Sequence, residues 1–329
     1  MAFGELVKRH LIDTRPLGVV EYRRIWMGQA VSHVGVGMTV VAVGQQVWEL
    51  THSSFWVGLL GMANLVPLVV FGLWGGAVAD AVDRRRLLIA GSFVAWAATL
   101  LILAQALLGL NNVYVVFAAV ALNATGFAIT GPTRGAIIPR IVDRELVPAA
   151  SALNSLVYSI GAVAGPMLGA VVLGSGGFAA AYAVDALLFT TSLYAALRLP
   201  SLPPLGEVTR PGARAVLEGL SFIVRSPVLL MSFVVDIIAM VFAMPRALYP
   251  ELTAHRFGGS VLALGWMTSA MAIGSVVGAL FSGWVGRVSR QGWRSSSSSP
   301  SGAWPWPPRG SRTTSGSWWC SWPSAAWRT

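Results

Sequence analysis

The sequence is poor in charged residues and has a single cysteine. Only 11% of its 329 residues are charged, against about a quarter in ordinary soluble chains. Because Cys320 is alone, an internal disulfide and a cysteine-based metal cluster are both excluded. The four histidines are scattered, and neither His-Glu-x-x-His nor a Gly-x-x-x-x-Gly-Lys phosphate loop occurs. We therefore predict no enzyme, no cofactor and no metal, and expect any energy to come from an ion gradient rather than from ATP.

The sequence contains instead a series of long apolar runs, and 55% of its residues are hydrophobic. Each run has the roughly 20 residues that a helix needs to cross a bilayer core of about 30 Å. The predicted spans are 25–48, 55–79, 87–108, 113–132, 149–174, 178–197, 228–250 and 262–285. They predict an all-α polytopic membrane protein. The first run is too long, and too far from the start, for a cleavable signal peptide.

The basic residues are unevenly distributed between the spans. With the N-terminus placed in the cytoplasm, 18 of the 23 Lys and Arg fall on the cytoplasmic side, two on the other side and three in the last 21 residues. Cytoplasmic loops of membrane proteins collect Lys and Arg, so this distribution accounts for the net charge of +10 without a nucleic-acid partner. We expect a multi-pass protein of the cell membrane with both termini in the cytoplasm.

Changes in composition divide the chain into five predicted segments. These are a cytoplasmic segment at 1–24, a six-helix bundle at 25–197, a central cytoplasmic loop with an amphipathic helix at 198–227, two further helices at 228–285, and a tail at 286–329. The polar entry to the first span and the glycine-containing exit from the second recur roughly 200 residues later, the weak internal symmetry typical of transporter repeats. The second repeat stops after two helices.

The tail has an unusual composition. Residues 291–329 contain 11 Ser, 7 Trp and 5 Pro but no Leu, Ile, Val, Met, Phe, Asp or Glu. One interpretation is a disordered linker, although disordered segments are usually poor in aromatic residues. The other is a coding region for further membrane helices that is read out of frame, because a CTG leucine codon followed by G yields the tryptophan codon TGG one base later. We favour the frameshift hypothesis, which sequencing of the locus would test.

A charged turn follows the second span. Its sequence pattern consists of Gly76, Asp80, Asp83, Arg84, Arg85 and Arg86. The glycine allows close helix approach, the first aspartate can accept hydrogen bonds at a helix end, and the arginines can pair with acids or anionic lipid. An ordinary positive-inside cluster would explain the arginines alone. The whole pattern resembles the loop between helices two and three of the major facilitator superfamily, in the form found in its drug and siderophore exporters.

A second motif lies in the fifth span. It consists of Gly161, Gly165, Pro166 and Gly169. Glycines four residues apart share one helix face and admit a neighbouring backbone, while the proline permits a kink. Such faces also occur in static bundles, but this one resembles the antiporter motif of the same superfamily. We predict that spans five and eight pack together. Span eight has its own stripe of small residues, formed by Ala270, Gly274, Gly278 and Ser282.

Ionisable residues within the spans are candidates for the transport path, because a charge inside a bilayer is costly. Asp236 lies near the middle of span seven and Asp185 within span six. Each is either a substrate or proton site or a hydrogen-bonded structural residue. The further candidates are Asn154, Tyr158, Arg246, Gln45 and Asn64, with His33, Gln46 and Asn123 as weaker ones.

The fourth span departs from the family pattern. Leu122 stands where the family often has an arginine implicated in proton coupling, so that role does not transfer to this chain. We expect Arg134, farther along, to lie near the inner interface, where its guanidinium can snorkel to water.

The resemblance covers residues 1 to about 290. It implies a carrier in which two halves rock about a central site, with Asp80 helping to hold one state, and the proton-coupled export of a small amphipathic drug or siderophore by a monomer. The alternative is an inactive fragment, since four of the family's twelve helices are missing. A membrane-embedded enzyme or receptor would need clustered chemistry that the sequence lacks.

Overall fold

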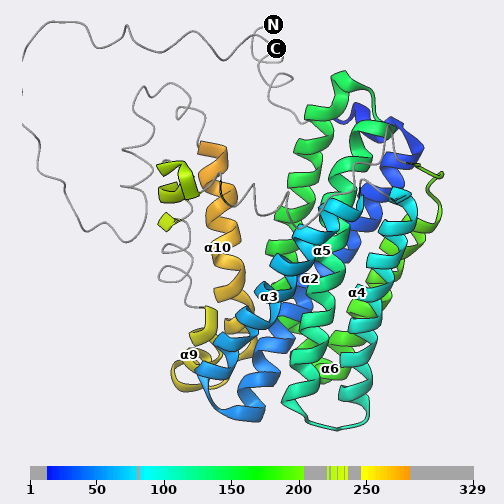
Figure 1. The fold of residues 1–329 in the computed structure, drawn as a ribbon. Helices are drawn as coiled ribbons and strands as arrows, with labels where there is room; N and C mark the ends of the chain where they lie inside the picture. Colours follow the sequence, from blue (N-terminus) through cyan, green and yellow to red (C-terminus); the bar gives the residue numbers. More distant parts are fainter. Residues whose placement is uncertain are drawn as a thin grey trace, which may run out of the picture. The chain divides into compact units, whose positions relative to one another are not determined.

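The fold is described from a computed structural model. It describes residues 13–79, 82–203, 221, 224–227, 229–232, 234–235 and 246–281, with only the backbone described in 73–79 and 278–281. All regular secondary structure in these residues is helical (Figure 1). The expected all-α membrane fold is therefore confirmed. Asp80, Asp236, most of the predicted amphipathic helix and the tail lie outside the described residues.

Five long helices account for most of residues 20–197. They are α2 (Val20–Thr51), α3 (Ser54–Ala79), α4 (Arg84–Leu107), α5 (Val113–Ile141) and α6 (Val147–Leu197), with 3-10 turns η1 (Arg15–Gly18) and η2 (Arg144–Leu146) before α2 and α6. In the described part of the chain, these five are long and apolar enough to cross a membrane. Because Gly177 has a φ of 70° and interrupts α6, that helix comprises two arms, 147–176 and 178–197.

Two predicted spans end elsewhere than expected. The fourth was predicted to end at Pro132, but α5 continues through Pro132 and Pro139 to Ile141. Proline removes one backbone hydrogen bond, yet leaving helical geometry within a membrane would leave more backbone groups unpaired. The predicted end of span seven is also wrong, because a 3-10 turn, η3 (Arg246–Leu248), leads into the separate helix α9 (Tyr249–Arg256). The last described helix is α10 (Val261–Phe281).

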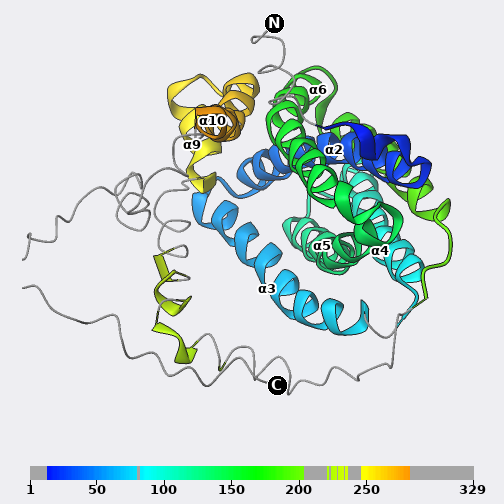
Figure 2. The same cartoon turned by 90° about the horizontal axis from the view of Figure 1, so that it is seen from above.

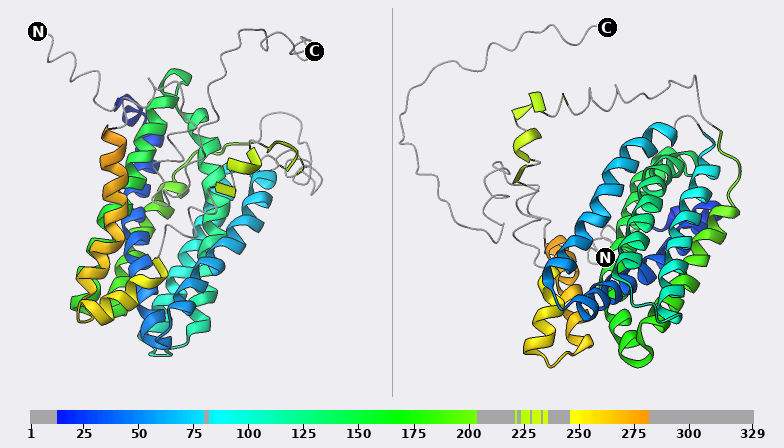
Figure 3. Two further views of the ribbon diagram at one scale, coloured as in Figure 1. Left: turned by 90° about the vertical axis from the view of Figure 1, so that its left-hand side faces the viewer. Right: turned by 60° about the horizontal axis from the view of Figure 1, so that its bottom comes forward.

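Helix α2 packs between the two arms of α6 (Figure 2). Its residues Gly28 and Gly35 face the second arm, and Gly37 faces the first. Helices α4 and α5 lie side by side where Gly126 of α5 meets the backbone of Gly91. Helix α3 contacts α5, and α10 contacts α6, as the turned views also show (Figure 3). The bundle is thus built around α2 and α6.

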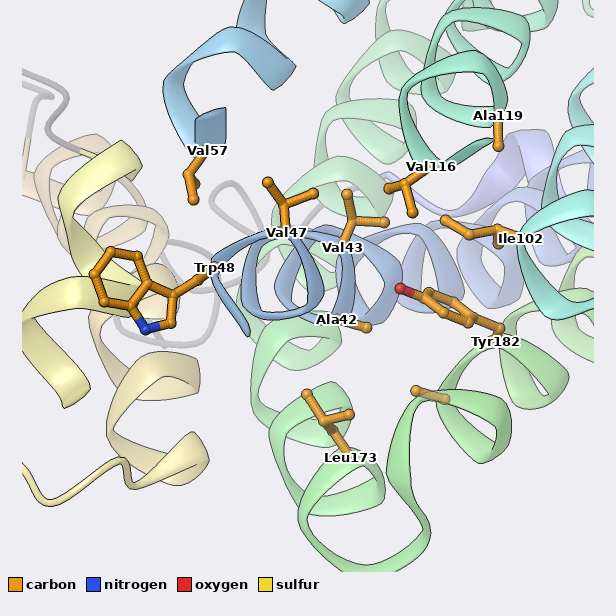
Figure 4. Packing of buried hydrophobic residues seen from close by; sticks show 11 residues of the cluster. Ala42, Val43, Val47, Trp48, Val57, Ile102, Val116, Ala119, Leu173 and Tyr182 are labelled. Carbon is orange, nitrogen blue, oxygen red and sulfur yellow. The ribbon is translucent and has the colours of Figure 1, made fainter. Parts of the chain in front are cut away.

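The largest buried apolar cluster joins all five of the long helices (Figure 4). Val43 and Val47 of α2 contact a group that includes Ile102 of α4, Val116 of α5 and Tyr182 of α6. Lipid tails are as apolar as these side chains, so the cluster stabilises the bundle by van der Waals packing rather than by escape from water.

Candidate transport site

The motif glycines of α6 bring its first arm against α2. A Cβ added at Gly165 would lie 2.6 Å from the Cα of Gly37, and one added at Gly169 would lie 2.6 Å from the Cα of Met38. Gly161 meets His33 in the same way. The predicted close approach of a neighbouring backbone is confirmed, and that neighbour is α2. The sequence pattern could not identify it, because glycine spacing defines a face but not its partner.

The first arm of α6 also contacts α10, as predicted for spans five and eight. Ser269 donates a hydrogen bond to the carbonyl of Val163 at 2.8 Å, and a Cβ at Gly265 would lie 2.6 Å from that of Ala170. The predicted contact between the two helices is confirmed, but the prediction of which face of α10 makes it is wrong. Of the predicted stripe, Ala270 is exposed and Gly274 has nothing within 4 Å, whereas the side-chain positions of Gly278 and Ser282 lie outside the described residues.

Asp185 is buried on the second arm of α6, where it faces α2. Only 2% of its surface is exposed. The Thr39 hydroxyl donates to its Oδ2 at 2.5 Å, while Oδ1 is buried without a hydrogen-bond partner. Gly35 makes room for this carboxyl group, because a Cβ there would collide with Oδ1. The sequence did not single out Thr39 or Gly35, although a glycine opposite a buried acid is a recognisable signal once the pairing is known.

Farther along α2, polar side chains continue beyond Asp185. Tyr182 donates to Gln46 Oε1 at 2.8 Å, and Gln45 donates to Glu49 at 3.0 Å. The Gln45 Oε1 atom is buried without a partner. The described hydrogen bonds of these groups thus join α2 to α6 or run within α2.

Arg134 is buried inside the bundle, with 7% of its surface exposed. Its Nη2 donates to the Ser192 hydroxyl of α6 at 3.0 Å, and its Nε is buried without a partner. The expectation that Arg134 snorkels at a helix exit is wrong, because α5 runs seven residues farther to Ile141. Arg134 was not among the candidate site residues predicted from the sequence, because the fourth span was predicted to end before it.

An aromatic pair lies on helices that contact α5, the helix of Arg134. Tyr158 of α6, which is 52% exposed, meets the His33 ring of α2 edge-on at a centroid distance of 4.4 Å. Asn154, one turn before Tyr158, is partly buried. The structure thus brings Tyr158 and His33 together, whereas Asn64 and Arg246 are exposed on α3 and η3.

The charged turn before α4 holds helix ends together. Asp83 caps α4 by accepting from the Arg85 amide at 2.9 Å, and it also accepts from the Leu202 amide at 3.2 Å. Arg84 donates to the Ala136 carbonyl of α5 at 2.9 Å, and Arg85 donates to the Leu197 carbonyl of α6 at 2.9 Å. Arg86 is exposed, and Gly76 lies in the last turns of α3.

A second set of contacts joins α9 to the ends of α2 and α3. The Ser54 hydroxyl at the start of α3 donates to the Glu251 carboxylate of α9. Trp48 of α2 meets the His255 ring at a centroid distance of 6.4 Å. The Ala247 methyl in η3 lies against Gly58, where an added Cβ would be 3.5 Å away. These contacts close one end of the α2–α3 region against the residues that follow 246.

Comparison with known proteins identifies the family. Residues 13–290 match the model of a family described as transmembrane secretion effector. The enterobactin exporter EntS of Shigella boydii is 30% identical over 293 residues, which are 87% of this chain and 68% of that protein. EntS of Escherichia coli O139:H28 is 29% identical over the same shares.

A solved structure has a similar fold. The POT family transporter PepTSo matches with a TM-score of 0.53 and 14% identity over 78% of this chain, which spans about half (55%) of that one. The relatives are transporters, which confirms the prediction that the chain is not an enzyme. It belongs to the transmembrane secretion effector family of the major facilitator superfamily.

Proposed function

We propose that the chain exports a small amphipathic molecule, a siderophore or a drug, across the cell membrane in exchange for protons. The similarity to enterobactin exporters supports the outward direction and the cargo class. The observation that carries the proposed mechanism is the buried Asp185 carboxyl group, which has one oxygen on Thr39 and the other without a partner. Carboxyl groups inside membrane helices are rare, and they are candidates for ion pathways and proton relays.

The Thr39 hydroxyl suits a carboxyl group that changes its protonation state. A hydroxyl donates to a carboxylate and accepts from a carboxylic acid, so the contact with Asp185 persists in both states. Between α2 and the same arm of α6, Tyr182 lies one turn before Asp185 and donates to Gln46. This pair supplies hydrogen-bonding groups through which a proton can approach Asp185.

Alternating access gives the contacts around α9 a function. With both termini in the cytoplasm, as the distribution of basic residues favours, the Ser54–Glu251 and Trp48–His255 contacts lie on the outer side. In that arrangement they hold the outer end closed, and they must separate for release of the cargo. We further propose that the carrier works as a monomer, with its site at the centre of the membrane.

Export can be tested with the purified 329-residue chain in proteoliposomes that carry an imposed proton gradient. Enterobactin and the cationic dye ethidium serve as two probes of different charge. We expect gradient-dependent transport of at least one probe, abolished when nigericin collapses the gradient. Transport that does not respond to the gradient would contradict proton coupling. If a thermal unfolding measurement shows that the protein is folded and neither probe is transported, the result would favour the alternative of a chain without transport activity.

The Asp185→Asn variant tests the coupling site. We expect it to lose gradient-driven transport while it retains exchange of labelled for unlabelled probe, because an amide keeps the shape and the Thr39 contact but cannot take up a proton. Thr190→Val, an exposed change on the same arm, is the matched control and should leave both activities unchanged. Normal coupling in Asp185→Asn would make Asp185 a structural residue.

A further inference from the structure

Arg134 is a buried cation whose charge no described residue balances. No described carboxylate forms an ion pair with it, and its one hydrogen bond goes to the neutral Ser192 hydroxyl. The buried carboxyl group of Asp185 precedes Ser192, the partner of Arg134, by seven residues, about 10 Å along a helix. Asp185 is itself bonded to Thr39, so the two charges occupy separate layers of the bundle. A buried charge without a counter-ion is costly, and such a group within a membrane protein is a functional hypothesis.

The guanidinium has donors to spare. Arginine carries five N–H groups in a planar fork, and Arg134 uses only Nη2, toward Ser192. Its Nε is buried and has no partner. A planar fork with free N–H groups matches the two oxygens of a carboxylate or of an acidic catechol better than it matches a neutral molecule.

The surroundings of Arg134 suit the apolar part of such a molecule. The Tyr158 ring is half exposed, and His33 supports it edge-on at 4.4 Å. The His33 ring is fixed in turn, because its Nδ1 lies 3.0 Å from the Gln29 carbonyl oxygen. A flat aromatic group can stack on the open face of Tyr158 while its acidic substituent reaches Arg134. The charge of Arg134 on α5 and the aromatic pair on α2 and α6 therefore lie on three helices that contact one another.

We propose that Arg134 anchors an acidic group of the transported molecule, whose aromatic or apolar part lies against Tyr158 and His33. The inference rests on the proposed export function and narrows its cargo to small amphipathic organic acids rather than cations. Asp185 then remains available for the proton, since the two sites use different residues. Cargo binding and proton binding are separable by substitution.

Equilibrium binding in detergent tests this proposal without requiring transport. Isothermal titration compares 1-naphthoate with its neutral analogue 1-naphthamide. We expect the wild-type chain to bind the anion more tightly, and Arg134→Gln to weaken naphthoate binding at least about tenfold without changing that of naphthamide. Arg140→Gln, which changes a partly exposed arginine near the end of the same helix, is the matched control and should bind like the wild type. A chain that binds the anion but exports nothing would sink the proposed function and leave this inference intact.

Further arms decide the remaining cases. If Arg134→Gln does not fold, Arg134→Lys takes its place in the test. Lysine keeps the positive charge but lacks the planar guanidinium, so this variant should still bind naphthoate more tightly than naphthamide. Equal binding of the two naphthyl probes by the wild type would overturn the proposal. The proposal would also be overturned if Arg134→Gln unfolds at a lower temperature than the wild type but still binds naphthoate more tightly than naphthamide. Arg134-dependent binding of dihexanoyl phosphatidylglycerol in place of naphthoate would make the cation a lipid site, and the proposal would be wrong.

Discussion

At the scale of single residues, the absence of a side chain determines how closely α2 and α6 approach. A methyl group at Gly37 would lie 2.7 Å from the Gly161 carbonyl oxygen and 2.8 Å from the Gly165 Cα. Both are backbone atoms, which cannot rotate away as a flexible side chain can. The contact therefore depends on these positions remaining glycine.

Alanine substitution in α2 tests that dependence. Gly37→Ala is expected to destabilise the protein by about 1–3 kcal/mol, the usual cost of overpacking, and to lower its thermal unfolding temperature in detergent. Gly44→Ala lies seven residues farther along the same helix, at a position with nothing within 4 Å, and should be neutral or slightly stabilising because alanine favours helix. Equal unfolding temperatures for the two variants would contradict the packing described for this seam.

The sequence predicted which helix face a residue lies on better than it predicted the contact partner of that residue. The glycines of the α6 motif were predicted to form one contact face, and they do, but the partner helix could be identified only from the three-dimensional pairing. Asp185 was predicted as a candidate from its cost in a membrane, yet its partner Thr39 is 146 positions away in sequence. Asp80 and Asp236 lie outside the described residues, so their roles stay predictions.

At the scale of helices, the ends were harder to predict than the spans. Long apolar runs determine where a chain crosses a bilayer, so α2 to α6 coincide with the first six predicted spans when the arms of α6 are taken separately. The fourth span was predicted to end at Pro132, but α5 continues past Pro132 and Pro139, because inside a membrane few partners other than the helix itself exist for its backbone groups.

The start of α4 depends on the cap at Asp83, which also accepts from the Leu202 amide after α6. Partial burial raises the pKa of Asp83. Hydrogen bonds from the Leu202, Arg85 and Arg86 amides and the charge of Arg86 lower it by more, so the pKa of Asp83 lies below the ordinary 3.8. A depressed folded-state pKa means that this stabilisation is fully present above the unfolded value and is lost as the pH falls through the folded one.

Replacing Asp83 therefore has a pH-dependent effect. Asp83→Ala is expected to cost about 1 kcal/mol at pH 7, the usual value of a lost helix cap, and progressively less below about pH 4. Thermal unfolding between pH 7 and pH 3 measures the difference from the wild type. Asp83→Asn keeps an acceptor without a titrating carboxyl group, so its own cap should not vary with pH. A constant difference between alanine and wild type over this range would show that the carboxylate does not stabilise the cap.

At the scale of the whole molecule, the contacts of α9 predict a trap for the carrier. The Ser54 and Glu251 side chains touch, so cysteines at the two positions in a Cys320→Ser background should be joined by a short bis-methanethiosulfonate cross-linker, which replaces the lost length of the glutamate. We expect cross-linking to stop transport in proteoliposomes and a reductant to restore it. The single-cysteine variants, treated in the same way, are the controls. Undiminished transport by the cross-linked protein would contradict opening at this end.

The fold class of the whole molecule was predictable, while its long-range contacts were not. Composition and periodicity carry the all-α membrane architecture, and two short motifs carry the family resemblance. The contact between α10 and α6 was predicted between the right helices but on the wrong face of α10. That helix has two faces with small residues, and the one with Gly265 and Ser269 contacts α6. Only the neighbouring α6 backbone decides between the two faces.

The break at Gly177 has a consequence for how the protein is made. With one non-helical residue between them, the two arms of α6 leave no hydrophilic loop to stay behind in water while one arm waits for the other. We therefore expect both arms to enter the membrane together, as one hairpin.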